Sequence, residues 1–160
     1  MPQAVSLGSV VTEEARFQFS PNLLEHLGIA AYHSVTKCLA ELTANCYDAD
    51  ATFVDITLPD VLDDNATIEI SDDGSGMSSA DITDEYLFVG KNRRARGGRS
   101  AGGRKVIGSK GIGKFAGFGI ASVIEVETVK GGTLSYLRLD RDDLEDVASL
   151  ADKRLLVRSE

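Results

Sequence analysis

The sequence predicts an α/β fold with two layers, in which helices cover one face of a mixed and mostly antiparallel sheet. Three observations support this prediction. The chain has 160 residues, a length that suits one domain over residues 1–160. Its composition of 42% hydrophobic and 26% charged residues is that of an ordinary globular protein. Strands joined by hairpin-length connections accompany the helices, which favours a two-layer sandwich over a doubly wound parallel sheet.

Patterns in the first half of the chain predict a strand, two helices and two further strands. The strands follow from alternating, β-branched segments, and the helices from apolar residues at helical spacing. Ser20 and Pro21 form a start signal for the first helix, and Gly28 ends it. In chain order, the predicted ranges are 15–19, 22–27, 29–48, 52–58 and 67–71.

The second half is expected to hold two short helices, a hairpin, and a closing helix and strand. Ser78 or Ser79 caps the first helix, which ends near Phe88. Three glycines make the second a poor helix in isolation. Lys130-Gly131-Gly132 joins the two strands of the hairpin. After the first helix, the predicted ranges are 112–120, 122–129, 133–140, 142–150 and 154–158.

Charge is distributed unevenly along the chain. Seventeen Lys and Arg against 25 Asp and Glu give a net charge of −8, which argues against nucleic acid or an anionic membrane as the main partner. Residues 91–124, however, contain no acidic residue and nine of the cations, and residues 90–119 contain ten of the sixteen glycines. A basic, glycine-rich loop therefore interrupts an acidic domain. The nine cations are Lys91, Arg93, Arg94, Arg96, Arg99, Arg104, Lys105, Lys110 and Lys114.

The sequence also bears on location. No apolar run is long enough to span a membrane, and the N-terminus carries no secretion signal. A cytoplasmic location is therefore expected, or a nuclear one in a eukaryote. Cys38 and Cys46 lie too far apart on one predicted helix to form a disulfide, so we expect buried thiols in a reducing compartment.

The predicted helix over 29–48 carries the first cluster of residues with chemical potential. Glu41, Asn45 and Asp48 follow one another at spacings of four and three, which places them on one polar stripe. A carboxylate there can orient and deprotonate water, and an amide oxygen is a hard ligand suited to Mg²⁺. Taken alone, such a triplet is more simply a solvated polar face.

Two further clusters are rich in glycine. Residues 72–77, Asp-Asp-Gly-Ser-Gly-Met, follow a predicted strand, and their glycines let the backbone approach a flat ligand while Asp accepts hydrogen bonds. Alone, this segment is a common β-turn. Residues 108–114, Gly-Ser-Lys-Gly-Ile-Gly-Lys, combine backbone N–H groups with lysines and predict an anion site. The segment is not a P-loop, because Phe115 stands where that motif requires Ser or Thr.

In order and spacing, the three clusters together resemble the nucleotide-binding domain of the GHKL ATPase superfamily, which has the Bergerat-type fold. This group includes gyrase B subunits, heat-shock-90-type chaperones, MutL mismatch-repair proteins, microrchidia ATPases and histidine kinases. The resemblance covers roughly residues 20–130. It implies ATP as the ligand, Mg²⁺ as the cofactor and ATP hydrolysis as the activity.

The resemblance also implies roles for individual residues. Glu41 is similar to the general base that activates water, and Asn45 to the Mg²⁺ ligand that bridges the phosphates. Asp48 resembles the acidic residue supporting that site, and Asp72 the carboxylate that accepts the adenine amino hydrogen. Residues 90–110 would form a mobile ATP lid. The other implied ATP-binding residues are Gly74, Gly76 and Met77 at the base, Gly90 and Asn92 in the lid, and Gly108, Ser109, Lys110, Gly111, Ile112, Gly113 and Lys114 at the phosphates.

Glu41 and Asp48 favour the ATPase branches, because histidine kinases usually carry Asn at the first position and another residue at the third. The implied function is an ATP-hydrolysing module that drives conformational change or nucleotide-dependent homodimerisation of a larger protein. Two alternatives stay open: a histidine or serine protein kinase on the same fold, and a nucleic-acid-binding module using the basic loop 91–105. No aromatic residue lies among those cations, so base stacking on that loop has no support.

The chain departs from the ATPase members near its end. They usually supply a Thr on a late strand near the adenine, and a catalytic Lys or Arg from a following transducer domain. Thr133 comes too early to be that Thr, and the chain stops soon afterwards, at Glu160. We therefore expect a domain truncated at its C-terminal end, a fragment of a longer protein, with slow or absent hydrolysis on its own.

Overall fold

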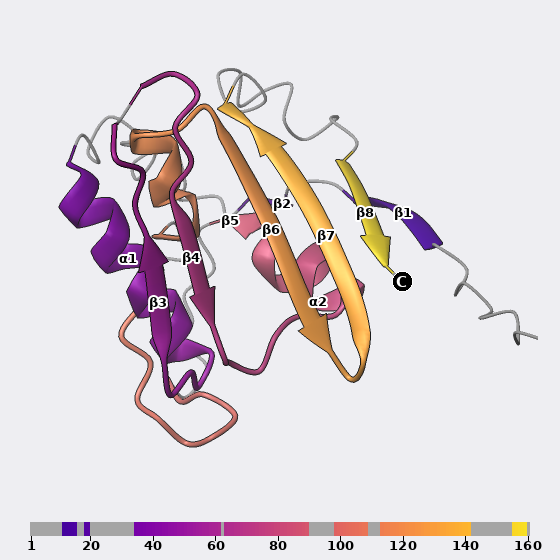
Figure 1. Cartoon of the computed structure of the whole chain (residues 1–160). Helices are drawn as coiled ribbons and strands as arrows, with labels where there is room; N and C mark the ends of the chain where they lie inside the picture. Colours follow the sequence, from indigo (N-terminus) through magenta and orange to yellow (C-terminus); the bar gives the residue numbers. More distant parts are fainter. Residues whose placement is uncertain are drawn as a thin grey trace, which may run out of the picture.

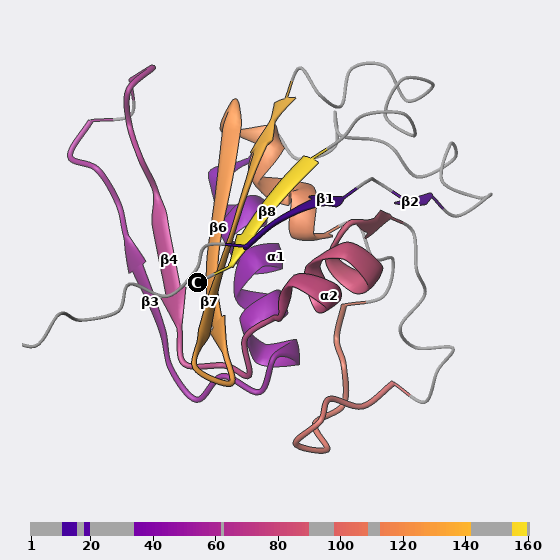
Figure 2. The same ribbon diagram turned by 90° about the vertical axis from the view of Figure 1, so that its right-hand side faces the viewer.

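Most strands of the computed structural model lie in one layer, and the helices lie on one side of it, together with a short parallel strand pair (Figures 1 and 2). This arrangement confirms the predicted α/β fold with helices on one face of mixed strands. The described residues are 11–15, 18–19, 34–61, 63–89, 98–108, 113–141 and 155–159. The predicted helices 22–27 and 142–150 lie outside them.

The largest sheet has four antiparallel strands in the order β1-β8-β7-β6. Their bounds are β1 Val11–Ala15, β8 Leu155–Ser159, β7 Thr133–Asp140 and β6 Val123–Lys130. β6 and β7 form the predicted hairpin, in which Lys130 pairs with Thr133. The two residues between them, Gly131 and Gly132, have φ angles of 61° and 83°. Because a two-residue hairpin turn of this kind needs positive φ at both positions, glycine suits both.

Two smaller pairs complete the strands. β3 (Val54–Thr57) and β4 (Glu69–Asp72) form the second predicted hairpin, which both views of the ribbon place beside β6 (Figures 1 and 2). β2 (Gln18–Phe19) pairs in parallel with β5 (Phe88–Val89). The edge strand predicted over 15–19 is therefore divided, since β1 ends at Ala15. The last strand was predicted correctly to within a residue.

The long helix α1 (Val35–Asp48) packs its apolar face on the short helix η5 (Gly113–Gly119). It begins after the cap residue Ser34, later than the predicted start at residue 29. Cys38 and Cys46 are free, buried thiols, as predicted, and the Cys38 Sγ donates to the Ala116 carbonyl oxygen at 3.1 Å. A Cβ at Gly117 would lie 3.1 Å from the Ile124 Cδ1, so η5 also packs closely on β6.

Two predicted helices differ from the structure. The segment predicted as a helix over 112–120 forms the 3₁₀ helix η5, because three glycines within it weaken α-helical geometry. The helix predicted to end near Phe88 consists of the single turn α2 (Ser79–Asp81) and the π-helical turn η3 (Ile82–Tyr86), after which Phe88 enters β5. Ser78 caps it as predicted: the Asp81 N–H donates to the Ser78 hydroxyl at 3.2 Å and the Ser78 N–H donates to the Asp81 carboxylate at 2.8 Å.

The described core lies between the strands and α1. Its hydrophobic members come from α1, η3, η5, β7 and the loops at the helix ends. They are Cys38, Cys46, Ala51, Ile82, Leu87, Val106, Ala116, Phe118, Leu137 and Leu139. Among the described residues, no helix is long and apolar enough to cross a membrane.

Candidate functional site

The two ends of the polar stripe of α1 lie against residues 107–108 and against Gly113. Asp48 is only 8% exposed, and its two carboxylate oxygens each accept one backbone N–H, from Ile107 and from Gly108, both at 2.9 Å. A Cβ at Gly108 would lie 2.8 Å from the same carboxylate. Asp48 therefore fixes the start of the glycine-rich segment 108–113 on the last turn of the helix.

The far end of that segment meets the other end of the stripe. A Cβ at Gly113 would lie 2.5 Å from the Glu41 Oε2, so the Gly113 backbone lies directly against this carboxylate. Asn45 lies between Glu41 and Asp48 on α1, and its side-chain amide has no hydrogen-bond partner among the described residues. Asp48 and Glu41, the two ends of the stripe, therefore lie against Gly108 and Gly113 respectively.

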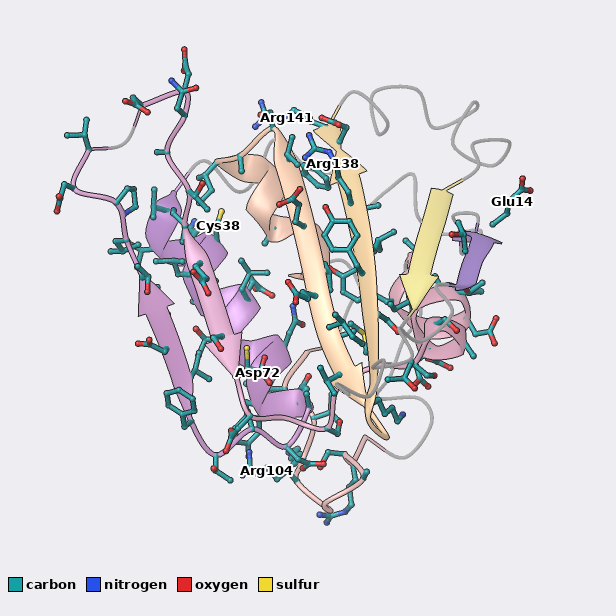
Figure 3. All side chains as sticks on the ribbon, turned by 45° about the vertical axis from the view of Figure 1, so that its right-hand side comes forward. Glu14, Cys38, Asp72, Arg104, Arg138 and Arg141 are labelled. Carbon is teal, nitrogen blue, oxygen red and sulfur yellow. The ribbon has the colours of Figure 1, made fainter. Side chains whose placement is uncertain are left out.

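Asp72 lies at the end of β4, beside the C-terminal end of α1. Its Oδ1 accepts the Gly74 N–H at 2.8 Å, and a Cβ at Gly74 would lie 2.6 Å from that oxygen and 2.9 Å from the Ala49 carbonyl oxygen. The Ser75 N–H donates to the same Ala49 carbonyl at 2.8 Å. Figure 3 shows Asp72 and Arg104 toward the same end of the molecule. The loop after β4 is thus folded tightly onto the helix end.

The Asp72 carboxylate also influences Cys46, the buried residue that follows Asn45. Burial raises the pKa of the Cys46 thiol to about 12, and the neighbouring negative charge of Asp72 adds to this effect. The thiol is consequently protonated and uncharged at neutral pH. The Asp72 carboxylate therefore lies beside a buried, neutral thiol of α1.

The second half of the loop is attached to β6. Gly76 has a φ of 63°, and a Cβ there would lie 2.0 Å from the Val129 carbonyl oxygen. The Met77 N–H donates to the Thr128 hydroxyl at 2.9 Å. Both glycines of this loop are therefore required by close approaches, Gly74 toward α1 and Gly76 toward β6.

Several residues of the site were not found by sequence reasoning. Asp73, next to Asp72, accepts the Thr52 N–H at 2.7 Å, the Phe53 N–H at 2.9 Å and the Thr52 hydroxyl, which lower the pKa of its carboxyl. From the sequence of the Asp pair alone, it could not be predicted that only Asp73 binds the residues just before β3. Thr128 likewise had no signal, because its partner Met77 lies 51 residues away.

A small hairpin that the sequence did not predict lies before Gly108. Arg99 and Lys105 form an antiparallel bridge, the Ser100 N–H donates to the Arg104 carbonyl at 2.9 Å, and the Gly103 N–H donates to the Ser100 carbonyl at 3.0 Å. We call residues 98–106 the 98–106 hairpin. In Figures 1 and 2 this segment lies below the C-terminal end of α1. It belongs to the expected lid 90–110, whose movement over a ligand stays a prediction.

Some expected site residues are not described. Lys114 lies in η5, where only its backbone is described. The expected residues outside the described ranges are Gly90, Asn92, Ser109, Lys110, Gly111 and Ile112.

The donor set suits a nucleotide and a hard cation. The uncommitted amide of Asn45 and the carboxylate of Glu41, one helical turn away, are oxygen donors of the type that Mg²⁺ prefers. The closely packed glycines at 74, 76, 108 and 113 hold backbone where a side chain would collide. Within the described ranges, no group of three His, Cys, Asp or Glu side chains forms a metal site by itself.

Comparison with known proteins identifies the family of the chain. The family model described as "Histidine kinase-, DNA gyrase B-, and HSP90-like ATPase" matches residues 32–157. The chain is also similar to a protein of Herpetosiphon aurantiacus named "Putative type II restriction enzyme HgiDII", with 38% identity over 127 residues. The match covers 79% of the chain and 20% of that protein, so the chain spans about a fifth of the relative's length. The chain belongs to the family of histidine kinase-, DNA gyrase B- and HSP90-like ATPases.

Proposed function

We propose that the domain binds ATP with Mg²⁺ and hydrolyses it. One observation carries this proposal: Asp48 and Glu41, at the two ends of the α1 stripe, lie against Gly108 and Gly113, the two ends of the glycine-rich segment. Backbone N–H groups of such a segment bind anions. The Glu41 carboxylate and the Asn45 amide, which lie one turn apart on α1, would supply the oxygen ligands that a triphosphate with its cation needs.

The adenine would lie against the loop after β4. The exposed carboxylate of Asp72 is suited to accept the exocyclic amino hydrogen of the base, and Gly74, Gly76 and Met77 would form the surface beside it. At the other end, Gly108 and Gly113 would border the phosphates. The proposed phosphate contacts also include Ser109, Lys110, Gly111, Ile112 and Lys114, with Gly90 and Asn92 from the expected lid.

For hydrolysis, Glu41 would orient a water molecule and accept its proton. Its carboxylate is half-buried and lies against Gly113. Asn45 would hold Mg²⁺ through its amide oxygen, and the cation would neutralise charge on the phosphates. Asp48 would act by positioning Ile107 and Gly108, since both its oxygens are engaged with their N–H groups.

We further propose that the ATPase serves a larger protein, in which nucleotide-driven conformational change or dimerisation is used on DNA. The support is the similarity to a protein named as a restriction enzyme, of which the chain spans about a fifth. The direct test is the ATPase rate of the full-length protein with and without double-stranded DNA. Stimulation by DNA would support this setting, and an unchanged rate with DNA present would count against it.

Two substitutions separate binding from hydrolysis. Glu41→Ala should keep the affinity for Mg²⁺ and a non-hydrolysable ATP analogue but lose hydrolysis by about 10²-fold or more, because the general base is gone. Asp72→Asn should lose binding, because an amide presents a donor to the amino group of the base. Calorimetric titration measures the affinity for the analogue, and phosphate release from the full-length protein measures hydrolysis.

The matched control is Asp55→Asn, an exposed carboxyl on β3 outside the proposed site. This variant should bind and hydrolyse like the parent. Hydrolysis by Glu41→Ala at the parent rate would refute the role of the base, and unchanged analogue binding by Asp72→Asn would refute the role at the adenine.

A further inference from the structure

The backbone of Asp50 adopts a conformation that normally belongs to glycine. Its φ is 65°, and it is the one described residue other than glycine with positive φ. The Asp50 N–H donates to the Tyr47 carbonyl and the Ala51 N–H donates to the Cys46 carbonyl, each at 3.1 Å. These two bonds are the Schellman pattern that ends a helix, and Asp50 occupies the position where glycine is preferred. An Asp at a glycine position points to a use for its carboxylate.

That carboxylate binds the 98–106 hairpin. One oxygen accepts the Ser100 hydroxyl, and the other accepts the Gly102 N–H at 2.7 Å. A Cβ at Gly102 would lie 2.7 Å from the first oxygen, so the turn passes directly over the carboxylate. These hydrogen bonds, with help from Arg104, lower the pKa of the Asp50 carboxyl. The Ser100 hydroxyl also accepts the Arg104 N–H at 2.9 Å, so the same contact holds the turn together.

Arg104 makes a second attachment from the hairpin to the end of α1. Its guanidinium donates to the Ala51 carbonyl, lies 5.2 Å from the centre of the Tyr47 ring and stands 4.0 Å from Asp50. The side chain of Arg104 is thereby committed to the helix end. Beyond it, the buried Val106 leads into Ile107 and Gly108, whose N–H groups Asp48 binds.

We propose that Asp50 is a positioning residue, which anchors the 98–106 hairpin on the end of α1 and so holds Gly108, the start of the glycine-rich segment, in place for a bound nucleotide. The role in nucleotide retention rests on the proposed ATP binding, whereas the anchoring does not. Asp50 touches neither nucleotide nor Mg²⁺ in this arrangement; it acts through Ser100 and Gly102.

Two variants at Asp50 separate the carboxylate from the backbone conformation. Asp50→Gly keeps the preferred residue for positive φ and removes the carboxylate, so the helix end should fold at least as well. Asp50→Asn keeps the size and the tolerance for positive φ but removes the charge. Ser100→Ala removes the partner hydroxyl, and Asp55→Asn is the control for a lost surface carboxyl.

The first measurement needs no nucleotide. Trypsin can cut the hairpin after Arg99, Arg104 and Lys105, and cleavage of a folded segment depends on how often it opens locally. In the full-length protein, Asp50→Gly should raise the rate of cleavage at these sites about tenfold, with a smaller rise for Asp50→Asn. The double variant with Ser100→Ala should add little to Asp50→Gly, because the two groups share one contact. An unchanged cleavage rate in Asp50→Gly would overturn the anchoring.

The second measurement is the dissociation rate of a fluorescent, non-hydrolysable ATP analogue with Mg²⁺. Loss of the anchor should raise this rate about tenfold and leave the association rate nearly unchanged, as is usual when positioning contacts are lost. Faster cleavage with an unchanged dissociation rate would overturn the role in nucleotide retention. A parent protein that does not bind the analogue would refute the proposed function, while the cleavage rates would still decide whether Asp50 anchors the hairpin.

Discussion

The close approach of the loop after β4 to β6 can be tested by giving Gly76 a side chain. Gly76 has a φ of 63°, and a Cβ there would lie 2.0 Å from the Val129 carbonyl oxygen. Gly131, in the turn of the β6–β7 hairpin, has a φ of 61°, but a Cβ there would meet nothing within 4 Å. Gly76→Ala and Gly131→Ala therefore share a backbone penalty and differ in the collision.

The difference between the two variants can be worked out from these contacts. An alanine at positive φ costs about 1–2 kcal/mol, and this cost is common to both. Alanine also restricts the unfolded chain more than glycine does, which stabilises each variant by about 0.4–1 kcal/mol and is likewise common to both. At Gly76, the loop must in addition move by more than about 1 Å to restore a carbon–oxygen contact of about 3.3 Å. Overpacking of this kind costs about 1–3 kcal/mol.

The same movement breaks the hydrogen bond from the Met77 N–H to the Thr128 hydroxyl, for about 1 kcal/mol more. We therefore expect Gly76→Ala to be less stable than Gly131→Ala by about 2–4 kcal/mol, the sum of these two contributions. Urea denaturation of both variants, with equal m-values, measures the difference. Two variants that agree to within about 0.5 kcal/mol would refute the close packing of this loop on β6.

Two further predictions concern stability. The Lys130 ammonium, 2.7 Å away, and Ser78 lower the pKa of the Asp81 carboxyl to about 2. The ionised carboxylate therefore stabilises the fold above pH 3.8, the pKa in the unfolded chain, and this stabilisation is lost as the pH falls toward 2. Because the Asp81 side chain is 36% exposed, we expect Asp81→Asn to lower the free energy of unfolding by only about 1 kcal/mol at pH 6, and by less toward pH 2. Urea unfolding at the two pH values measures this loss. An equal loss at both would contradict the stabilisation by the ionised carboxylate. The Ser135 hydroxyl is buried without a hydrogen-bond partner in the described structure, so Ser135→Ala should raise stability by about 1 kcal/mol. The melting temperature by circular dichroism should rise by about 2–4 °C, and a lower one would show that the hydroxyl is satisfied.

Local patterns were enough to predict the elements that depend on neighbouring residues. The hairpins β3–β4 and β6–β7 follow from alternation and from glycine in a tight turn, and the α1 stripe follows from helical spacing. The β2–β5 pair was not predicted, because two residues form no pattern and the partners are far apart in the sequence. The three glycines of η5 predicted a poor helix, but they did not by themselves predict a 3₁₀ helix.

In the candidate site, too, local patterns predicted some residues, and contacts between distant residues were missed. Glycine spacing indicated where backbone would approach a ligand, and the helix spacing indicated Glu41, Asn45 and Asp48. Asp73 differs from Asp72 because it accepts hydrogen bonds from Thr52, about twenty residues earlier. No local sequence pattern could predict this contact. Asp50 was hidden for the same reason, since its partner Ser100 is 50 residues away and a positive φ cannot be read from the residue type alone.

The turn that ends α1 receives both loops of the proposed site. The Ala49 carbonyl accepts the Ser75 N–H from the loop after β4, and the Ala51 carbonyl accepts the Arg104 guanidinium from the 98–106 hairpin. A ligand that stabilises this turn through one loop changes the docking free energy of the other, and thermodynamic linkage makes the effect equal in both directions. If adenine tightens the hairpin by a given factor, a docked hairpin tightens adenine binding by the same factor. The three residues Ala49, Asp50 and Ala51 would then carry the coupling free energy between the base and the 98–106 hairpin.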